Sequence, residues 1–166
     1  MKRFAIIASI AMLFLAVGCK KNNQNEPVQP QPEPQPQPES IIGNVSAPAW
    51  TALEDYDMTS SMTAVVKIDL SSLYTAEQLS GAGYQLKAED KVAAFAGDEC
   101  LGVIELQNGL FFVYINAPKT DSDITVKYYS SVLKHIYADK ESFPFLNDTQ
   151  LGSAGSPYTP IWTIEK

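Results

Sequence analysis

Residues 90–103 read DKVAAFAGDECLGV, and this stretch decides the fold. After Asp90-Lys91 it contains the apolar run Val92–Ala96, and it ends within a second one, Leu101–Leu106. The polar tripeptide Gly97-Asp98-Glu99 lies between the two runs. Short apolar runs on either side of a glycine-containing loop are typical of a β-hairpin. We therefore expect two antiparallel strands here, joined by a tight turn.

The same β pattern continues on both sides of this hairpin. Upstream, residues 62–70 end in strict alternation, with Val66, Ile68 and Leu70 on one face. Downstream, Asn108-Gly109 marks a second turn, and an aromatic, β-branched run follows it. Further strands are expected at residues 110–115, 123–129, 135–138 and 160–165, with one helical turn at residues 75–79. The pattern predicts an all-β fold, an antiparallel β-sandwich of about seven strands.

The stretch 90–103, with residues 62–66 before it and 126–129 after it, resembles an immunoglobulin-like β-sandwich module. Such modules recur in secreted and cell-surface proteins of the Bacteroidota. The resemblance covers most of the region from Trp50 to Trp162. It implies an immunoglobulin-like fold and an extracellular setting, and it implies no catalytic activity.

The first residues have the pattern of an export signal. A basic start, Met1-Lys2-Arg3, precedes the apolar run Phe4–Leu15, and small residues follow up to Cys19. The apolar run is shorter than the roughly 20 residues that a membrane-spanning helix needs. We therefore expect a signal peptide over residues 1–18.

The end of this signal resembles a bacterial lipobox, because Ala16-Val17-Gly18 leads directly into Cys19. In lipoproteins the signal is cut before the cysteine, which is then acylated, so the resemblance assigns Cys19 a lipid and the protein a membrane partner. The alternative is an ordinary secretory signal. The resemblance favours the outer membrane, because Lys20 replaces the Asp that favours inner-membrane retention. We expect display on the cell surface, with a periplasm-facing head as the alternative.

Residues 19–40 read as a disordered tether. They contain no aromatic side chain, and prolines alternate with Gln and Glu at positions 30 to 38. Proline fixes φ and removes a backbone donor, so an extended polyproline-II-like rod is expected, with a rise of about 3.1 Å per residue. The tether leads into a single head domain, residues 41–166.

The head is acidic. It has eight Lys residues and sixteen Asp or Glu residues, and therefore a net charge of −8. No arginine follows Arg3. A surface of this charge repels nucleic acid, which excludes nucleic acid as an expected partner.

The inventory of reactive side chains predicts no enzyme, no cofactor and no metal. Cys100 is the second of two cysteines and is expected to be a buried apolar residue, and His135 is the single histidine. No Gly-x-Ser-x-Gly elbow is present to support a Ser-His-Asp arrangement.

Acidic residues are paired in predicted turns, where their side chains cap backbone N–H groups. The pairs are Glu54-Asp55-Tyr56-Asp57, Glu89-Asp90, Asp98-Glu99 and Asp121-Ser122-Asp123. A weak calcium site is the alternative, because oxygen ligands in loops suit that ion. No Asp-x-Asp-x-Asp-Gly series accompanies them.

The aromatic residues near loops are the candidates for ligand binding. Trp50 and Trp162 are expected to close the two ends of the core, with sugar stacking as the alternative. The candidate ligand-binding residues are the loop tyrosines Tyr56, Tyr74, Tyr84 and Tyr158, which an exposed platform would bring together.

These observations predict a lipid-anchored cell-envelope interaction or adhesion module with no enzymatic activity, whose partner is an extracellular protein or glycan. The alternative is a glycan-capturing accessory lipoprotein of an outer-membrane uptake system, similar in layout to starch-binding accessory lipoproteins. A small hydrolase is the third interpretation.

Overall fold

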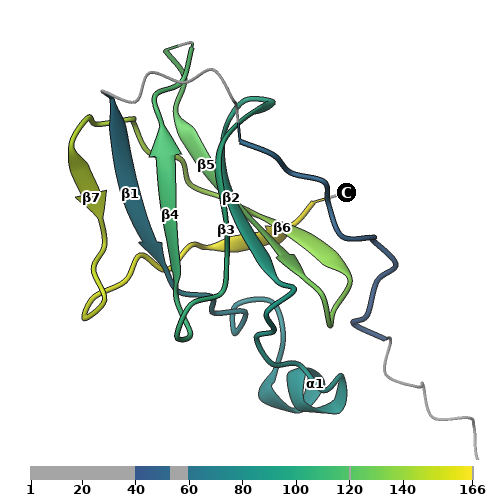
Figure 1. The fold of residues 1–166 in the computed structure, drawn as a ribbon. Coiled ribbons are helices and arrows are strands. Elements are labelled where there is room, and N and C mark those ends of the chain that lie inside the picture. Colours follow the sequence, from purple (N-terminus) through teal and green to yellow (C-terminus); the bar gives the residue numbers. More distant parts are fainter. Residues whose placement is uncertain (1–39, 53–59, 120, 166) are drawn as a thin grey trace, which may run out of the picture. The chain divides into compact units, whose positions relative to one another are not determined.

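A computed structural model describes residues 40–52, 60–119 and 121–165. The chain divides into two units, residues 1–37 and residues 38–166, and the fold described here belongs to the second. It is an all-β, sandwich-like fold with one short helix (Figure 1). No helix in the described ranges is long and apolar enough to cross a membrane.

The strands form two sheets. The smaller sheet has the order β4-β1-β7 and the larger one the order β3-β2-β5-β6-β8. Neighbouring strands are antiparallel except β1 and β7, which are parallel. The described residues thus form eight strands, where the sequence predicted about seven. Their bounds are β1 Ser61–Val66, β2 Lys91–Ala96, β3 Glu99–Glu105, β4 Phe111–Asn116, β5 Ile124–Ser130, β6 His135–Asp139, β7 Thr149–Leu151 and β8 Trp162–Ile164.

The main core lies between the two sheets and follows the alternation seen in the sequence. On the β1 segment, the core residues are Met62, Ala64, Val66, Ile68 and Leu70. The strand itself ends at Val66, but the alternation of buried and exposed side chains continues to Leu70. The predicted inward face of this segment is therefore confirmed.

The hairpin predicted at residues 92–106 is confirmed as β2 and β3. Its turn contains Gly97 with a φ of 59°, a left-handed conformation that glycine adopts without steric cost. The pairing changes register between Ala94 and Phe95, which marks a β-bulge.

The second predicted turn is present, but it does not join two strands of one sheet. Asn108 and Gly109 both have positive φ, and only Gln107 and Leu110 pair across the turn. Beyond it the chain passes from β3 in the larger sheet to β4 in the smaller one. The backbones of β3 and β4 still approach closely, because a Cβ added to Gly102 would lie 1.9 Å from the carbonyl oxygen of Tyr114. This part of the expected succession of hairpins is therefore corrected to a corner between the two sheets.

The connection between β1 and β2 carries the single helix of the described residues, α1 (Ala76–Gly81), at the bottom of Figure 1. Thr75 and Gln78 form a reciprocal capping box at its start. The predicted helical turn is confirmed.

Residues 40–52, which we call the strap, run along the larger sheet. The backbone N–H of Gly43 donates to the carbonyl oxygen of Leu133 at 2.8 Å, and that of Val45 donates to Lys134 at 3.0 Å. These two bonds attach the strap to the turn between β5 and β6.

The other end of the strap covers a second, smaller cluster on the outer side of the larger sheet. This cluster consists of Ala93, Phe95 and Cys100. The ring of Trp50 packs edge-on against Phe95, with ring centroids 5.6 Å apart. The strap therefore shields the outer side of the larger sheet and is part of the folded head.

Candidate binding face

The loop tyrosines predicted from the sequence do not form an exposed platform in the described residues. Tyr74 and Tyr84 are half-buried and pack against the main core. The hydroxyl of Tyr74 lies 3.3 Å from that of Tyr137, and the hydroxyl of Tyr84 lies 3.4 Å from that of Tyr128. Both side chains therefore direct their polar ends towards the interior.

Tyr158 shows the same arrangement at another place in the fold. Its ring packs against Phe143, with centroids 5.8 Å apart, and its hydroxyl donates to Asp139. Tyr56 lies outside the described residues. A role of these four tyrosines in ligand binding stays a prediction, but an exposed platform is wrong for the three described ones, because packing against the core outweighs their position beside loops.

The buried tyrosines have raised pKa values. Burial raises the pKa of Tyr84 to about 12 and raises the pKa of Tyr128 and Tyr137 further, because the phenolate loses its hydration. In the unfolded chain a tyrosine ionises near pH 10. The stability that these groups contribute is thus complete below about pH 10 and is lost as the pH rises through 10 towards the folded pKa.

We therefore expect the free energy of unfolding to fall steeply between about pH 10 and pH 12. Urea unfolding followed by circular dichroism, with phenolate absorbance recorded in parallel, measures this fall. Tyr84→Phe removes one of the shifted groups and should make the fall shallower. Full ionisation of all tyrosines near pH 10 in a chain that keeps its folded spectrum would contradict the prediction.

The two tryptophans occupy different environments. Trp162 is 0% exposed and belongs to the main core, with its ring centroid 5.9 Å from that of Tyr128. Trp50 is half-buried on the outer side of the larger sheet. The core position predicted for Trp162 is confirmed, whereas Trp50 covers the smaller cluster.

Asp90 of the acidic pairs is a structural carboxylate. It is 0% exposed, and it accepts hydrogen bonds from the Tyr128 hydroxyl at 2.9 Å and from the Ser131 backbone N–H at 2.8 Å. The Ser131 hydroxyl and the Lys87 N–H also donate to it, at 2.6 and 3.1 Å. Asp90 thus holds the start of β2 against the turn after β5.

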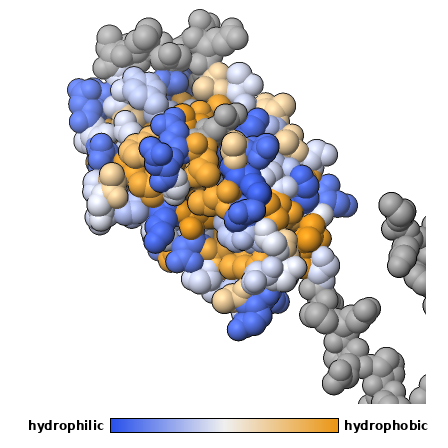
Figure 2. All heavy atoms as spheres, turned by 60° about the horizontal axis from the view of Figure 1, so that its bottom comes forward, coloured by the Kyte–Doolittle hydropathy of each residue, from blue (hydrophilic) through white to orange (hydrophobic). Residues whose placement is uncertain are grey.

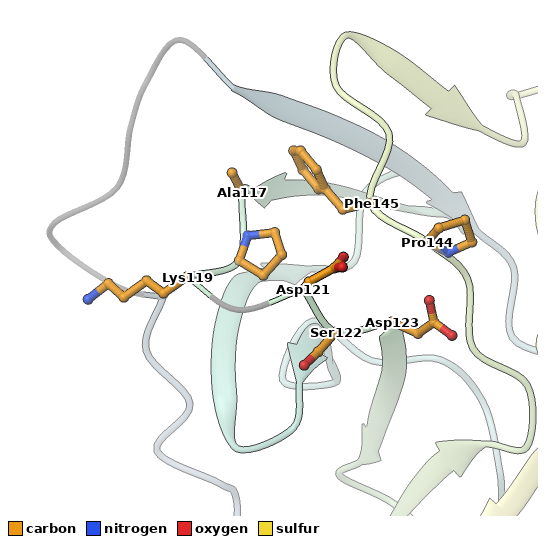
Figure 3. Close-up of a pocket in the computed structure, with 8 residues that line it drawn as sticks. Ala117, Lys119, Asp121, Ser122, Asp123, Pro144 and Phe145 are labelled. Carbon is orange, nitrogen blue, oxygen red and sulfur yellow. The ribbon is translucent and has the colours of Figure 1, made fainter.

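Asp121 and Asp123 line a hollow of about 310 Å³ between the β4–β5 and β6–β7 connections. Figure 3 shows Phe145 on one side of this hollow and Lys119 extending away from the two carboxylates. The Ser142 hydroxyl lies 3.5 Å from Asp123 Oδ2. Among the described residues, no group of three or more His, Cys, Asp or Glu side chains is arranged to hold a metal ion. The calcium alternative therefore gains no support here.

The remaining reactive side chains are packing residues. Cys100 is buried, as predicted, and burial raises the pKa of its thiol. The ring of His135 packs edge-on against Tyr137 at 6.0 Å and lies beside Gly43, where a Cβ would come within 2.5 Å of it.

Two aromatic side chains that the sequence analysis did not single out are exposed together. Phe112 and Tyr114 alternate with buried residues on β4, and their side chains are 37% and 49% exposed. Both point away from the core, because Phe111, Val113 and Ile115 point into it. Their rings therefore lie on the outer side of the smaller sheet.

Polar side chains of the neighbouring strands lie on the same side. Thr63 of β1 is in register with Tyr114 on one side and with Gln150 of β7 on the other. Their strand neighbours Ala64 and Leu151 pack into the core, so Thr63 and Gln150 face outwards. We call the outward side chains Thr63, Phe112, Tyr114 and Gln150 the aromatic face.

The aromatic face differs from the rest of the exposed apolar surface. Figure 2 shows apolar side chains surrounded by hydrophilic ones at the end of the head that holds α1. Six large apolar side chains of the described residues are more than a third exposed: Ile42, Phe112, Tyr114, Leu146, Ile161 and Ile164. Single exposed apolar residues are normal on a protein surface. Phe112 and Tyr114 differ from single residues, because they lie two residues apart on the same face of one strand.

The sequence contained a signal for this face. Residues 111–116 read FFVYIN, in which Phe112 and Tyr114 alternate with the apolar residues of the core. Because every position of this run is apolar or aromatic up to Ile115, the inward and outward faces look alike in the sequence. Such a run is typical of a central strand, whereas β4 lies at the edge of the smaller sheet.

No protein-family model, no curated protein and no solved structure matches this chain.

Proposed function

We propose that this protein is a lipid-anchored, non-enzymatic binding module of the bacterial cell envelope, with an immunoglobulin-like head at the end of a proline-rich tether. The signal pattern ending at Cys19 supports the anchor, and the tether composition supports a head held away from the lipid. The observation that carries the binding role is the aromatic face, on which two rings are exposed side by side in a well-packed sandwich.

Glycan capture is the second candidate, and one observation favours it. The exposed rings share one sheet face with the hydroxyl of Thr63 on the neighbouring strand and with the amide of Gln150 on the strand after it. Aromatic faces contact the C–H faces of sugars, while hydroxyl and amide groups bond to sugar hydroxyls.

The anchor is tested at one residue. Cys19→Ser removes the acylated thiol, so we expect the protein to move from the membrane fraction to the soluble fraction and to lose incorporation of radiolabelled fatty acid. Cys100→Ser is the matched control, because Cys100 is buried in the head and should leave both lipid label and membrane retention unchanged. Membrane retention of Cys19→Ser would show that the anchor is wrong.

Protease treatment of intact cells tests the orientation. Surface display predicts cleavage within residues 26–40 in intact cells. Full protection in intact cells, with cleavage only after lysis, would place the head in the periplasm.

A further inference from the structure

We propose that the aromatic face binds a neutral polysaccharide, with Phe112 and Tyr114 stacking on sugar rings and Thr63 and Gln150 bonding to their hydroxyls. This inference rests on the proposed binding function and names its ligand class. It is argued from the geometry of the rings, the charge of the sheet and the area of the face.

The two rings are spaced to contact more than one sugar unit. Residues i and i+2 of a strand lie about 7 Å apart on the same face. Phe112 and Tyr114 have this spacing, and both side chains are more than a third exposed. A flat ligand along β4 can therefore lie over both rings at once, and aromatic rings favour flat apolar faces such as the C–H side of a pyranose.

The amide of Gln150 is held in place, and the backbone of Thr63 is fixed by its two neighbouring strands. Gln150 Nε2 donates to the carbonyl oxygen of Gly152 at 2.8 Å, which orients the amide. Thr63 lies on the central strand of the sheet, in register with both Tyr114 and Gln150. Side chains fixed before binding lose less conformational entropy when a ligand arrives.

The sheet that carries the face is uncharged. β1, β4 and β7 contain no Asp, Glu, Lys or Arg, although the head has a net charge of −8. By contrast, β2, β3, β5 and β6 of the larger sheet all contain charged residues. Lys67 and Asp69 follow β1 on the outward side, but the strands themselves offer a charged partner no complementary group, and a neutral chain of sugars requires none.

The area of the face is too small for a stable protein partner or a second copy. The six-residue strands β1 and β4 are about 20 Å long, the three-residue strand β7 is about 10 Å long, and three strands are about 15 Å wide, so the sheet face covers less than about 300 Å². Stable protein interfaces need about 800 Å² from each partner. Negative charge on both copies would also oppose self-association. Two rings on β4, a hydroxyl on the neighbouring β1 and an amide one strand further, on β7, are of the right size for a short stretch of polysaccharide.

The experiment is native affinity electrophoresis of the detergent-solubilised full-length protein in gels that contain a single polysaccharide. The neutral probes are amylopectin, galactomannan, xyloglucan and dextran, and the acidic probe is polygalacturonate. We expect retardation by at least one neutral probe and none by the acidic one. The double variant Phe112→Ala/Tyr114→Ala should raise the dissociation constant about tenfold to a hundredfold, because each stacked ring contributes up to about tenfold.

Two control variants make the result specific to the rings. Tyr114→Phe keeps the ring and should keep most of the retardation. Ile161→Ala removes a side chain that is 46% exposed, close to the 49% of Tyr114, but lies outside the aromatic face, and it should leave retardation unchanged. All variants should keep the melting temperature of the parent within a few degrees, which shows that the fold is intact.

Three results would overturn the inference. They are the absence of retardation by every neutral probe, retardation that the double variant does not reduce, and stronger retardation by polygalacturonate. If the neutral probes fail while cross-linking in cell envelopes joins the parent, but not the double variant, to a protein, the face binds a protein. In that case the proposed binding function stands and the glycan inference fails. If neither assay responds to the double variant, the binding function at this face fails as well.

Discussion

Replacing Asp90 by Ala is expected to lower the free energy of unfolding by about 4 kcal/mol. The carboxylate is fully buried and accepts four hydrogen bonds, from Tyr128, Lys87 and both donors of Ser131. Hydrogen bonds to a charged group contribute about 1.5 to 3 kcal/mol each, and a buried donor left without its acceptor adds a desolvation cost. The contributions of the four hydrogen bonds do not simply add, because the Tyr128 hydroxyl can bond to Tyr84 instead when Asp90 is removed.

Urea unfolding followed by tryptophan fluorescence measures this loss. Asp98→Ala is the matched control, because Asp98 is an exposed acid at the tip of the β2–β3 hairpin and should change stability by no more than about 0.5 kcal/mol. Asp90→Asn should give an intermediate loss, since its amide nitrogen replaces one acceptor with a donor. A stability of Asp90→Ala within about 1 kcal/mol of the parent would show that the four bonds do not hold the two segments together.

Trp162→Ala is expected to cost about 3 to 5 kcal/mol, the range for large aromatic truncations in a core. The side chain is 0% exposed and packs among the residues of the main core, so its removal leaves a cavity between the sheets. Its indole N–H has no hydrogen-bond partner among the described residues. Trp162→Phe, which removes this buried donor, should therefore recover more than half of the loss.

The structure separates the two tryptophans, which the sequence analysis treated alike. Trp50 is half-buried over Phe95 on the outer side of the larger sheet, so Trp50→Ala should cost about 1 to 2 kcal/mol, less than Trp162→Ala. Thermal unfolding of the two variants side by side tests this order. An equal loss in both would show that the strap end is as tightly packed as the main core.

The strands were predictable where local chemistry marks them. Gly97 and Asn108-Gly109 mark turns, because these residue types tolerate positive φ. The alternation of apolar and polar residues marks the inward face of residues 62–70. β7 carried no such signal, because its three residues, Thr149–Leu151, are too few for a period and depend on pairing with the distant β1. The close approach of Gly102 to Tyr114 likewise depends on contacts between the two sheets. In the sequence it is indicated only by the glycine itself.

The candidate site was harder to predict than the fold. Neighbouring Gly, Ser and Asp residues made Tyr74 and Tyr84 look exposed, but their hydroxyls meet Tyr137 and Tyr128, more than forty positions along the chain. Phe112 and Tyr114 are the opposite case, since their strand is apolar on both sides in the sequence but exposed on one side in the structure. Exposure of an aromatic ring is set by which elements cover it, and that is a property of the tertiary fold.

The strap also determines how the head responds to mechanical load. In a protein held through its N-terminus, a pulling force enters at residue 40 and reaches the strap contacts in chain order, first the Gly43–Leu133 bond, then Val45–Lys134, and last the Trp50 ring. Contacts loaded one after another yield at lower force than contacts loaded together. Detaching residues 40–52 would release about 40 Å of chain, at about 3.3 Å per residue, before any strand of either sheet is pulled. In a protein anchored as proposed, detachment of the strap would therefore lengthen the attachment under load while the two sheets stay folded.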